Sequence, residues 1–340
     1  MLQMTDRLVV TDLPGFRTAF APDRLTLGLL FPIEAYSGDI PRMRNQERLA
    51  RTAEAAGFAA LWVRDVPLRV PEFGDVGQIY DPWVFLGWIA AHTRRIALGT
   101  ASIVLPLRHP LHTAKAAASI DQLSGGRLLL GVASGDRPQE YPAFGAPFDQ
   151  RQDAFREHLR LLRQALSEDF PVLASPYGEI RGVDLLPKPF GRELPVLVTG
   201  SSGQSPDWIA REGHGWLTYP RPPLRQRQVI AEWRSAVEAV APGMFKPFAQ
   251  SLYIDLTADP DHPPRPIHLG WRLGRNLLVE LLEELRGSGA NHVILNLKYG
   301  TRPAEEVLEE LAAHVAPRFP AMVGDADEDG PATSPGAGPR

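Results

Sequence analysis

The chain has 340 residues, of which 44% are apolar and 22% charged, so it is long enough to bury a large core in one or two domains. Its net charge of -4 and its lack of a Lys/Arg-rich run argue against a nucleic-acid partner. The absence of cysteine excludes disulfides, thiolate nucleophiles and cysteine-ligated metal clusters. The sequence has no run of 18 apolar residues and no basic segment followed by an apolar core, so we expect a cytoplasmic protein that does not span a membrane.

Residues 1–24 show no clear periodicity, and we expect an N-terminal arm without regular structure; the alternative is a short helix that packs Leu13, Phe16 and Phe20 against the body. From residue 25 onward, short apolar runs alternate with segments of helical periodicity. The apolar runs predict strands at residues 25–31, 58–63, 96–105, 127–133, 195–199, 216–219, 248–256 and 292–297. The helical segments are residues 42–56, 82–92, 110–124, 150–166, 206–212, 224–240 and 303–315, with one more that ends near Gly287.

Eight strands, each followed by a helix, predict an α/β fold, a (β/α)8 TIM barrel, over residues 25–320. Loops interrupt this pattern at residues 64–80, 134–149, 171–189 and 257–272, and the third of them suggests an inserted hairpin. The tail at residues 321–340 is so polar and so rich in Gly and Pro that we expect disorder there.

The stretch from Ile96 to Asp136 is the clearest local unit, because a strand, an Ala-rich helix opened by Pro110 and a second strand follow one another closely. Such a unit is a parallel β-α-β crossover. Since parallel strands carry their chemistry at their carboxyl ends, the first candidates for a site are Thr100, Ser102, Ser134, Gly135 and Asp136.

A Gly/Ser turn lies in V-L-V-T-G-S-S-G-Q-S-P-D-W, residues 196–208, between a strand and a helix. The backbone N–H groups, the helix dipole and the hydroxyls of Ser201, Ser202 and Ser205 together predict a phosphate site. The alternative is that Ser205 is only a helix N-cap and the turn only a connection. Asp207 counts against a phosphate, since it already occupies part of the favourable field of the dipole.

These motifs, above all D-Q-L-S-G-G-R before the strand L-L-L-G-V, resemble the bacterial luciferase-like, flavin-dependent oxidoreductases. G-F-A-A-L-W-V-R-D, Y-P-A-F-G and T-G-S-S-G-Q-S-P-D-W fit the same pattern, which covers about residues 25–320. The resemblance implies a homodimeric barrel that binds reduced FMN as a co-substrate or, in some branches, the deazaflavin F420. It also implies a monooxygenase that acts on a small organic substrate and is often fed by a separate flavin reductase.

By this resemblance, the flavin phosphate is assigned to the turn residues Gly200, Ser201, Ser202, Gly203 and Ser205. The flavin ring is assigned to Thr100, Ala101 and Ser102, where small side chains leave room for a flat ring, and Ser134 lies at the neighbouring strand end. A basic residue that assists the phosphate in the family falls on His112, which is not an arginine here, so Lys115 or Arg108 is a possible substitute.

The clearest departure from the family follows the second strand, where members commonly have an Asp-His pair and this chain has Asp65-Val66. Asp65, Arg64 and His109 are the candidate catalytic residues, although Asp65 and Arg64 have the alternative of a structural ion pair. A metal site is not expected, because no H-x-x-x-H or H-E-x-x-H pattern occurs, and a dinucleotide fold is not expected, because no G-x-G-x-x-G follows the first strand.

Three alternatives to an FMN-dependent monooxygenase stay open. The first two, within the same fold, are an F420-dependent dehydrogenase and a non-catalytic flavin-binding relative, which the missing histidine makes conceivable. The third is a phosphate-binding barrel of the isomerase or aldolase type, which is disfavoured because Lys298 is the only lysine at a confident strand end.

Five arginines follow predicted strands on the face where a barrel builds its active site, namely Arg64, Arg69, Arg137, Arg221 and Arg272. Guanidinium groups are suited to bidentate capture of a carboxylate, sulfonate or phosphate. If even two of them converge, the pocket favours an anionic organic substrate, with Trp271 and Tyr141 as apolar walls. The alternative is that they are solvated loop charges.

Overall fold

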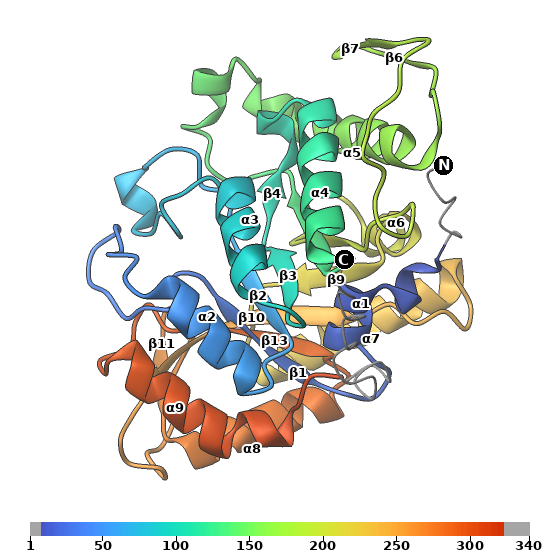
Figure 1. The fold of residues 1–340 in the computed structure, drawn as a ribbon. Coiled ribbons are helices and arrows are strands. Elements are labelled where there is room, and N and C mark those ends of the chain that lie inside the picture. Colours follow the sequence, from blue (N-terminus) through green and yellow to red (C-terminus); the bar gives the residue numbers. More distant parts are fainter. Residues whose placement is uncertain (1–7, 323–340) are drawn as a thin grey trace, which may run out of the picture.

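The computed structural model describes residues 8–322 and contains a closed barrel of parallel strands surrounded by helices (Figure 1). The barrel strands are β1 Thr26–Leu30, β2 Ala60–Val63, β3 Ala97–Thr100, β5 Leu128–Ala133, β8 Val196–Thr199, β9 Gly215–Thr218, β10 Phe248–Leu256 and β13 His292–Asn296. Each strand pairs in parallel with the next one, and β13 pairs with β1, so that the sheet closes. The (β/α)8 TIM barrel predicted from the sequence is confirmed.

A helix follows each barrel strand, and local sequence signals set where these helices begin and end. The helices are α2 Gln46–Ala55, α3 Pro82–His92, α4 Pro110–Ser124, α5 Arg151–Ser167, α6 Pro206–Glu212, α7 Pro223–Val240, α8 Arg275–Gly287 and α9 Ala304–His314. At the start of α3, the Asp81 carboxylate accepts hydrogen bonds from the backbone N–H groups of Trp83 (2.9 Å) and Val84 (3.2 Å). At the end of α4, Gly125 adopts a left-handed φ of 70°.

Successive residues of the strands point alternately toward the helices and into the barrel. In β2, Leu61 and Val63 belong to the large core between the sheet and the helices, whereas Ala60 and Trp62 belong to a second core inside the barrel. The sheet therefore separates two apolar cores, and the inward-facing residues decide what each end of the barrel can hold.

The N-terminal arm contains a 3-10 turn, Val10–Asp12, and helix α1, Pro14–Ala19. Its side chains Leu13, Phe16 and Phe20 are buried in the core inside the barrel. The expectation of an irregular arm is therefore wrong, and the short packed helix is correct. A helix of six residues is too short to show periodicity, and it is stabilised because it covers apolar side chains at the amino-terminal end of the strands.

Trp62 packs inside the barrel, in the same core as the side chains of the arm, and is fully buried. A Cβ atom at Gly99 would lie 2.1 Å from its ring, so the absence of a side chain there makes room for the indole. The Trp62 indole N–H donates to His292 (3.0 Å), His292 donates to the Thr26 hydroxyl (2.7 Å), and Thr26 donates to the carbonyl of Ala19 in α1 (2.6 Å). Burial lowers the pKa of His292 to about 3, so the ring is neutral and the chain of hydrogen bonds is complete.

The hairpin predicted between residues 171 and 189 is present as β6 Leu173–Ser175 and β7 Gly178–Ile180. It projects from the barrel beside α5 (Figure 1). Residues 96–105, predicted as one strand, are instead divided into β3 and β4 Ile103–Val104. The division occurs because the backbone at residues 101–102 leaves the strand direction before β4 pairs again with β5.

Residues 257–272, predicted as a loop, contain a second hairpin, β11 Arg265–Ile267 and β12 Gly270–Leu273. The edge that stabilises it belongs to the far half of β10, where Tyr253 to Leu256 pair with β12. Strands of three and four residues carry too little alternation to be recognised without that edge. The hairpin tip reaches the carboxyl end of the barrel and thereby the site described below.

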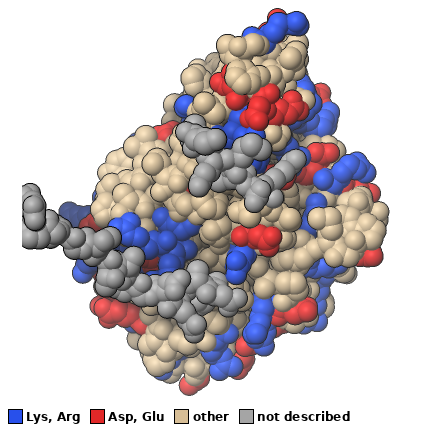
Figure 2. Space-filling model, turned by 45° about the vertical axis from the view of Figure 1, so that its right-hand side comes forward, with Lys and Arg blue, Asp and Glu red and all other residues tan. Residues whose placement is uncertain are grey.

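Charged side chains of both signs are interspersed over the visible face in Figure 2. A surface of this kind does not present the single-sign field that binds a polyanion. Among residues 8–322, no helix has both the length and the apolar composition needed to cross a bilayer.

Candidate active site

A cavity of about 750 Å³ lies at the carboxyl ends of the barrel strands. Its floor consists of inward-facing residues of the strands and of the break after β3, namely Leu30, Ala101, Ala133, Thr199, Leu217, Ser251 and Ile294. Its walls come from the segments after β2, β5, β8 and β9 and from the tip of the β11–β12 hairpin. This volume lies within the range of about 300–1,000 Å³ that is usual for sites of small ligands and cofactors.

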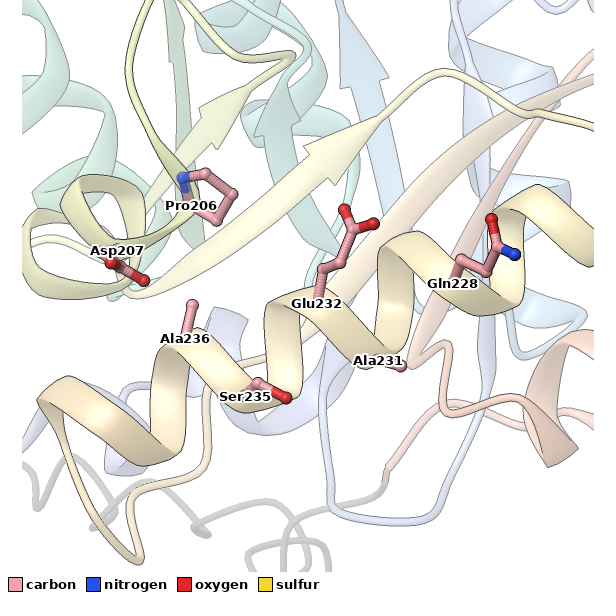
Figure 3. Close-up of a pocket in the computed structure, with 7 residues that line it drawn as sticks. All are labelled: Pro206, Asp207, Gln228, Ala231, Glu232, Ser235 and Ala236. Carbon is pink, nitrogen blue, oxygen red and sulfur yellow. The ribbon is translucent and has the colours of Figure 1, made fainter.

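A second hollow, of about 730 Å³, lies outside the barrel between the start of α6 and one face of α7 (Figure 3). Its lining includes the carboxylates of Asp207 and Glu232, the side chains of Gln228 and Ser235, and no cationic group. Such a lining repels anions and would not hold a phosphate, whereas the cavity inside the barrel is lined by the cations Arg64, Arg137 and Arg151.

The Gly/Ser turn after β8 forms one wall of the cavity through Gly200, Ser201, Ser202 and Gly203. Ser202 holds it in place, because its hydroxyl donates to the carbonyl of Thr199 (3.0 Å) and accepts the backbone N–H of Ser134 (3.1 Å). Gly200, Ser202 and Gly203 have φ values of 60°, 48° and 72°. Left-handed residues in a tight turn aim backbone N–H groups toward a common point, which is the arrangement that binds a phosphate.

Arg151, the first residue of α5, lies in the cavity lining and was missed by the sequence reasoning. Its guanidinium stacks 3.7 Å from the ring of Phe148 and donates to the Phe148 carbonyl (2.9 Å). The adjacent Gln152 packs directly over Gly203, because a Cβ atom at Gly203 would lie 2.1 Å from the amide carbon of Gln152. The pairing of β5 with β8 brings the two loops together and places this cation near the Gly/Ser turn.

Ser205 has the role that the alternative interpretation gave it. Its hydroxyl accepts the backbone N–H of Trp208 (3.2 Å) as the N-cap of α6, and it does not line the cavity. The three basic residues considered for the phosphate also lie elsewhere. The ring of His112 contacts that of His109 edge to face, Lys115 donates to the carbonyl of Leu186, and Arg108 pairs with Asp65 and Asp81.

Of the residues predicted to contact the flavin ring at the break after β3, only some line the cavity. Ala101 and Ser102 line the cavity, together with Ser134, Gly135 and Asp136 at the end of β5. Thr100 does not, because it faces away from the interior, is fully buried and donates its hydroxyl to the carbonyl of Gly131 (2.7 Å). Thr100 therefore holds β3 against β5.

An aromatic wall stands elsewhere in the cavity and consists of Phe73, Tyr219, Tyr253, His268 and Tyr299. The ring of Tyr253 lies 5.1 Å from that of Tyr299 and 6.0 Å from that of His268. Burial raises the pKa of Tyr253 to about 12, so this phenol stays protonated and can donate a hydrogen bond. His268, at the tip of the β11–β12 hairpin, had no signal in the sequence because that hairpin was taken for a loop.

The family model of luciferase-like monooxygenases matches residues 25–254 of the chain. The chain belongs to this family.

Similar proteins agree with this assignment. The 4-hydroxyprotoasukamycin monooxygenase of Streptomyces nodosus subsp. asukaensis is 32% identical over 202 residues, which are 57% of this chain and 52% of that protein. Monooxygenase RslO1 from Streptomyces bottropensis has a TM-score of 0.72 at 21% identity and covers 87% of this chain and 99% of its own. An F420-dependent secondary alcohol dehydrogenase has a TM-score of 0.71 at 18% identity and covers 86% and 98%. At these identities, the two structures support the fold alone. The chain spans 66% or less of the length of the curated relatives compared with it.

In this luciferase-like protein, Asp65 is paired with Arg108 rather than with Arg64. The Arg108 guanidinium donates to both oxygens of Asp65 at 2.7 Å, and the backbone N–H of Val104 donates to one of them (3.1 Å). The Asp65 side chain is only 1% exposed. The ion pair considered from the sequence is therefore wrong in its partner, and these charge-assisted hydrogen bonds fix Asp65 in the cavity wall.

Arg64 pairs instead with Asp75, at 2.9 and 3.0 Å, and both residues line the cavity of this luciferase-like protein. Asp75 also accepts hydrogen bonds from the Tyr36 hydroxyl and the backbone N–H of Gly77, both at 2.8 Å. Burial acts to raise the pKa of Asp75, but the charge and hydrogen bonds of Arg64 outweigh it and lower that pKa. The pair is therefore charged and internally neutralised.

His109, the third catalytic candidate, is exposed and does not line the cavity. One ring nitrogen accepts the backbone N–H of Leu111 at the start of α4, and the other contacts the carbonyl of Tyr177 (3.0 Å). Within residues 8–322, no group of three or more acidic, histidine or cysteine side chains is arranged to hold a metal ion.

Several polar atoms in the cavity lining are buried without a hydrogen-bond partner: the hydroxyls of Thr199 and Ser251, one terminal nitrogen of Arg137 and the Nε of Arg64. A buried donor or acceptor without a partner costs about 1–3 kcal/mol. Four of the nine such atoms among residues 8–322 belong to residues that line this cavity, and a polar ligand bound there would supply the missing partners.

Proposed function

We propose that the protein is a flavin-dependent monooxygenase that binds reduced FMN in the barrel cavity and acts on a small organic substrate. The observation that carries this proposal is the phosphate cradle, in which the Gly/Ser turn with its left-handed residues Gly200, Ser202 and Gly203 shares the cavity lining with the cation Arg151. Family membership supports a redox role for a ligand held there, whereas the cradle supports an anionic cofactor.

The residues of the cavity fit such a cofactor. Ala101 and Ala133 leave space for a flat ring, while the unpartnered hydroxyls of Thr199 and Ser251 offer hydrogen bonds to its polar edge. Bound reduced flavin would supply the electrons for the reaction, and the chain's own residues would orient it, exclude water and donate hydrogen bonds. Tyr253, with a pKa of about 12, is a donor over the whole physiological range.

The acidic lining of the hollow between α6 and α7 supports FMN over F420 as the cofactor. F420 carries a longer tail with several carboxylates, and the hollow adjoining the first turn of α6 is lined by the carboxylates of Asp207 and Glu232. Like charges at this place would repel such a tail, whereas FMN ends at its phosphate. The F420-dependent dehydrogenase of similar fold makes F420 the alternative to test.

Binding and chemistry are tested separately. Anaerobic titration with reduced FMN and with reduced F420 should give an at least tenfold lower Kd for FMN, and turnover of a substrate under ¹⁸O₂ should place one labelled oxygen in the product. Tighter binding of F420, or substrate oxidation without label, would replace the monooxygenase by a dehydrogenase. If FMN binds but no substrate panel supports turnover, the non-catalytic relative becomes the better interpretation.

We also propose that reduced flavin is delivered by a separate flavin reductase. The sequence offers no G-x-G-x-x-G fingerprint after β1 at which a nicotinamide dinucleotide would bind. The protein with FMN and NADH alone should therefore consume no oxygen, and the addition of a flavin reductase should start the reaction. Oxygen consumption with NADH alone would contradict this part of the proposal.

A homodimer formed through α3 is the third element of the proposal. This helix is almost entirely apolar, yet Val84 and Trp88, one turn apart, are 72% and 40% exposed. Leu123, at the end of the adjacent α4, is 78% exposed. A helix that is apolar on all sides is normally covered. Light scattering should give a dimer that Val84→Glu converts to a monomer and that Leu224→Glu, an equally exposed position on α7, leaves intact.

A further inference from the structure

The five arginines predicted at the carboxyl ends of strands do not all reach the cavity. Three of them do not line the cavity: Arg69 pairs with Asp39, Arg221 donates to the carbonyl of Tyr219, and Arg272 lies 3.4 Å from Asp255. Arg64 and Arg137 line the cavity. Trp271 and Tyr141, predicted as its apolar walls, do not line it.

The two arginines in the lining differ in how their charge is balanced. Arg64 forms two hydrogen bonds to the Asp75 carboxylate, so its charge is neutralised inside the protein. Arg137 donates to the backbone carbonyl of Asp75 (3.0 Å), and its guanidinium lies 4.7 Å from the centre of the Phe73 ring. No ion pair of Arg137 occurs within the described part of the chain, although Asp136 is its sequence neighbour.

The contacts of Arg137 are those expected of a residue that binds a ligand rather than of one that only stabilises the fold. The carbonyl of Asp75 and the ring of Phe73 fix the direction of the guanidinium, while its other terminal nitrogen is buried in the cavity lining without a partner. An oriented cation with an unused, desolvated N–H donor is the arrangement that recognises a carboxylate or sulfonate. A solvated loop charge would have this nitrogen in water.

Arg137 is also separated in function from the phosphate cradle. Arg137 contacts Asp75 and Phe73 in the loop after β2, whereas Arg151 contacts Phe148, just before α5. The ring in contact with Arg137 is that of Phe73. Burial raises the pKa of Tyr219, and the charges of Arg64 and Arg137 act to lower it. A flavin phosphate held at Arg151 therefore leaves Arg137 free.

We propose that the substrate is an organic anion whose carboxylate or sulfonate binds Arg137 and whose apolar, ring-containing body packs against the aromatic wall. This inference rests on the proposed function, since it takes the cradle at Arg151 to be occupied by the flavin phosphate. The aromatic wall supplies flat apolar surface for the body of the ligand, and Arg137 supplies an oriented cation that forms no ion pair within residues 8–322, although its charge also acts on the pKa of Glu140.

The test compares matched acids and amides as probes. Binding of 2-naphthoate and of 2-naphthamide is measured by calorimetry on the FMN-loaded protein and on the protein without FMN. The wild-type protein should bind the carboxylate at least tenfold more tightly than the amide, and Arg137→Gln should abolish this preference while the Kd for FMN changes less than twofold. Arg137→Lys, which keeps the charge, should retain part of the preference. The matched control Arg69→Gln, at a surface ion pair, should behave as the wild type.

Every other outcome bears on the inference. Equal binding of acid and amide by the wild type, or a preference that survives in Arg137→Gln, would overturn it. A preference lost in Arg151→Gln but kept in Arg137→Gln would mean that the acid occupies the phosphate cradle, which also overturns it. Failure of the wild type to bind FMN would defeat the proposed function instead, and the measurements without FMN would still show whether Arg137 selects anions. If Arg137→Gln unfolds below room temperature, Arg137→Lys and the acid-to-amide ratio of the wild type decide.

Discussion

At the amino-terminal end of the barrel, the indole of Trp62, the imidazole of His292 and the hydroxyl of Thr26 hydrogen-bond to one another and to the arm. At the carboxyl-terminal end, the buried hydroxyls of Thr199 and Ser251 have no hydrogen-bond partner among residues 8–322. Both ends are built from inward-facing residues of the same strands. One end is thus completed by the chain itself, whereas the other keeps unpartnered hydroxyls that the proposed ligand would satisfy.

This difference shows how to distinguish polar groups that hold the fold from polar groups that serve a site. Asp65 lies in the cavity lining but belongs to the first kind, because Arg108 and the Val104 N–H satisfy its oxygens. Arg137 lies in the same lining and belongs to the second kind, because one nitrogen is unpaired. Position in a cavity is therefore a weaker indicator of function than an unmet hydrogen bond.

The largest effect should come from removing the arm's anchor. Phe16→Ala deletes a ring that is 2% exposed in the core inside the barrel, so it should lower the free energy of unfolding by about 3–5 kcal/mol in urea denaturation. The Kd for FMN, measured on the folded fraction, should be unchanged. Phe73→Ala, 40% exposed at the open end, is the matched control and should cost much less stability. Equal losses from both would contradict the distinction between the ends.

Asp65→Asn should cost about 3 kcal/mol, because it leaves the partly buried Arg108 without its main counter-ion. Unfolding curves should show the loss, and turnover per folded molecule should persist. Asp39→Asn, which breaks the exposed pair with Arg69, should have little effect on stability. If Asp65→Asn keeps its stability but loses turnover, Asp65 is a catalytic residue after all.

The buried His292 at the amino-terminal end of the barrel should also make the protein sensitive to acid. Folding keeps His292 neutral with a pKa of about 3, whereas in the unfolded chain it binds a proton below about pH 6.5, so acid favours unfolding. The free energy of unfolding should fall by up to about 1.4 kcal/mol per pH unit from pH 6.5 toward pH 4 because of this group. His292→Gln should be less stable at pH 7 but have a shallower slope than His109→Gln, whose ring is exposed. Identical slopes would argue against His292 as the cause.

At the open end, Arg151→Gln should raise the Kd for FMN about 10- to 100-fold, the size expected for a charge-assisted hydrogen bond, and should leave the melting temperature nearly unchanged. Arg156→Gln is the matched control on the same helix, since Arg156 pairs with Gln204 and Asp153 outside the cavity. An FMN affinity that falls equally in both variants would point to general electrostatics rather than a cradle.

The smallest effects should separate two serines of the turn. Ser205→Ala removes the N-cap of α6 and should cost about 1 kcal/mol of stability without changing the Kd for FMN. Ser201→Ala, exposed toward the cavity, should weaken FMN binding by about 1 kcal/mol without changing stability. The reverse pattern in fluorescence titrations and thermal melts would restore the phosphate role that the sequence suggested for Ser205.

Much of the fold follows from signals that act within one element. Asp81 before Pro82, and Gly125 after Ser124, set the ends of helices through caps that involve only neighbouring residues. The Gly/Ser turn could be proposed as an anion site for the same reason, because its N–H groups belong to consecutive residues. The helix of the arm and the β11–β12 hairpin could not, since each is stabilised by a surface that distant strands provide.

The sequence by itself determined the alternation of strands and helices, the closed barrel that this alternation favours, and the Gly/Ser turn for which we propose phosphate binding. Only the tertiary structure decided which charges neutralise one another: Asp65 pairs with a residue 43 positions away, and the arginine next to it pairs with Asp75. The same holds for Arg151 and His268, which reach the cavity from helix α5 and a hairpin tip. The physical reason is range, because caps and periodicity act between neighbours in the chain, whereas the pairing and desolvation of charges depend on packing between elements far apart in it.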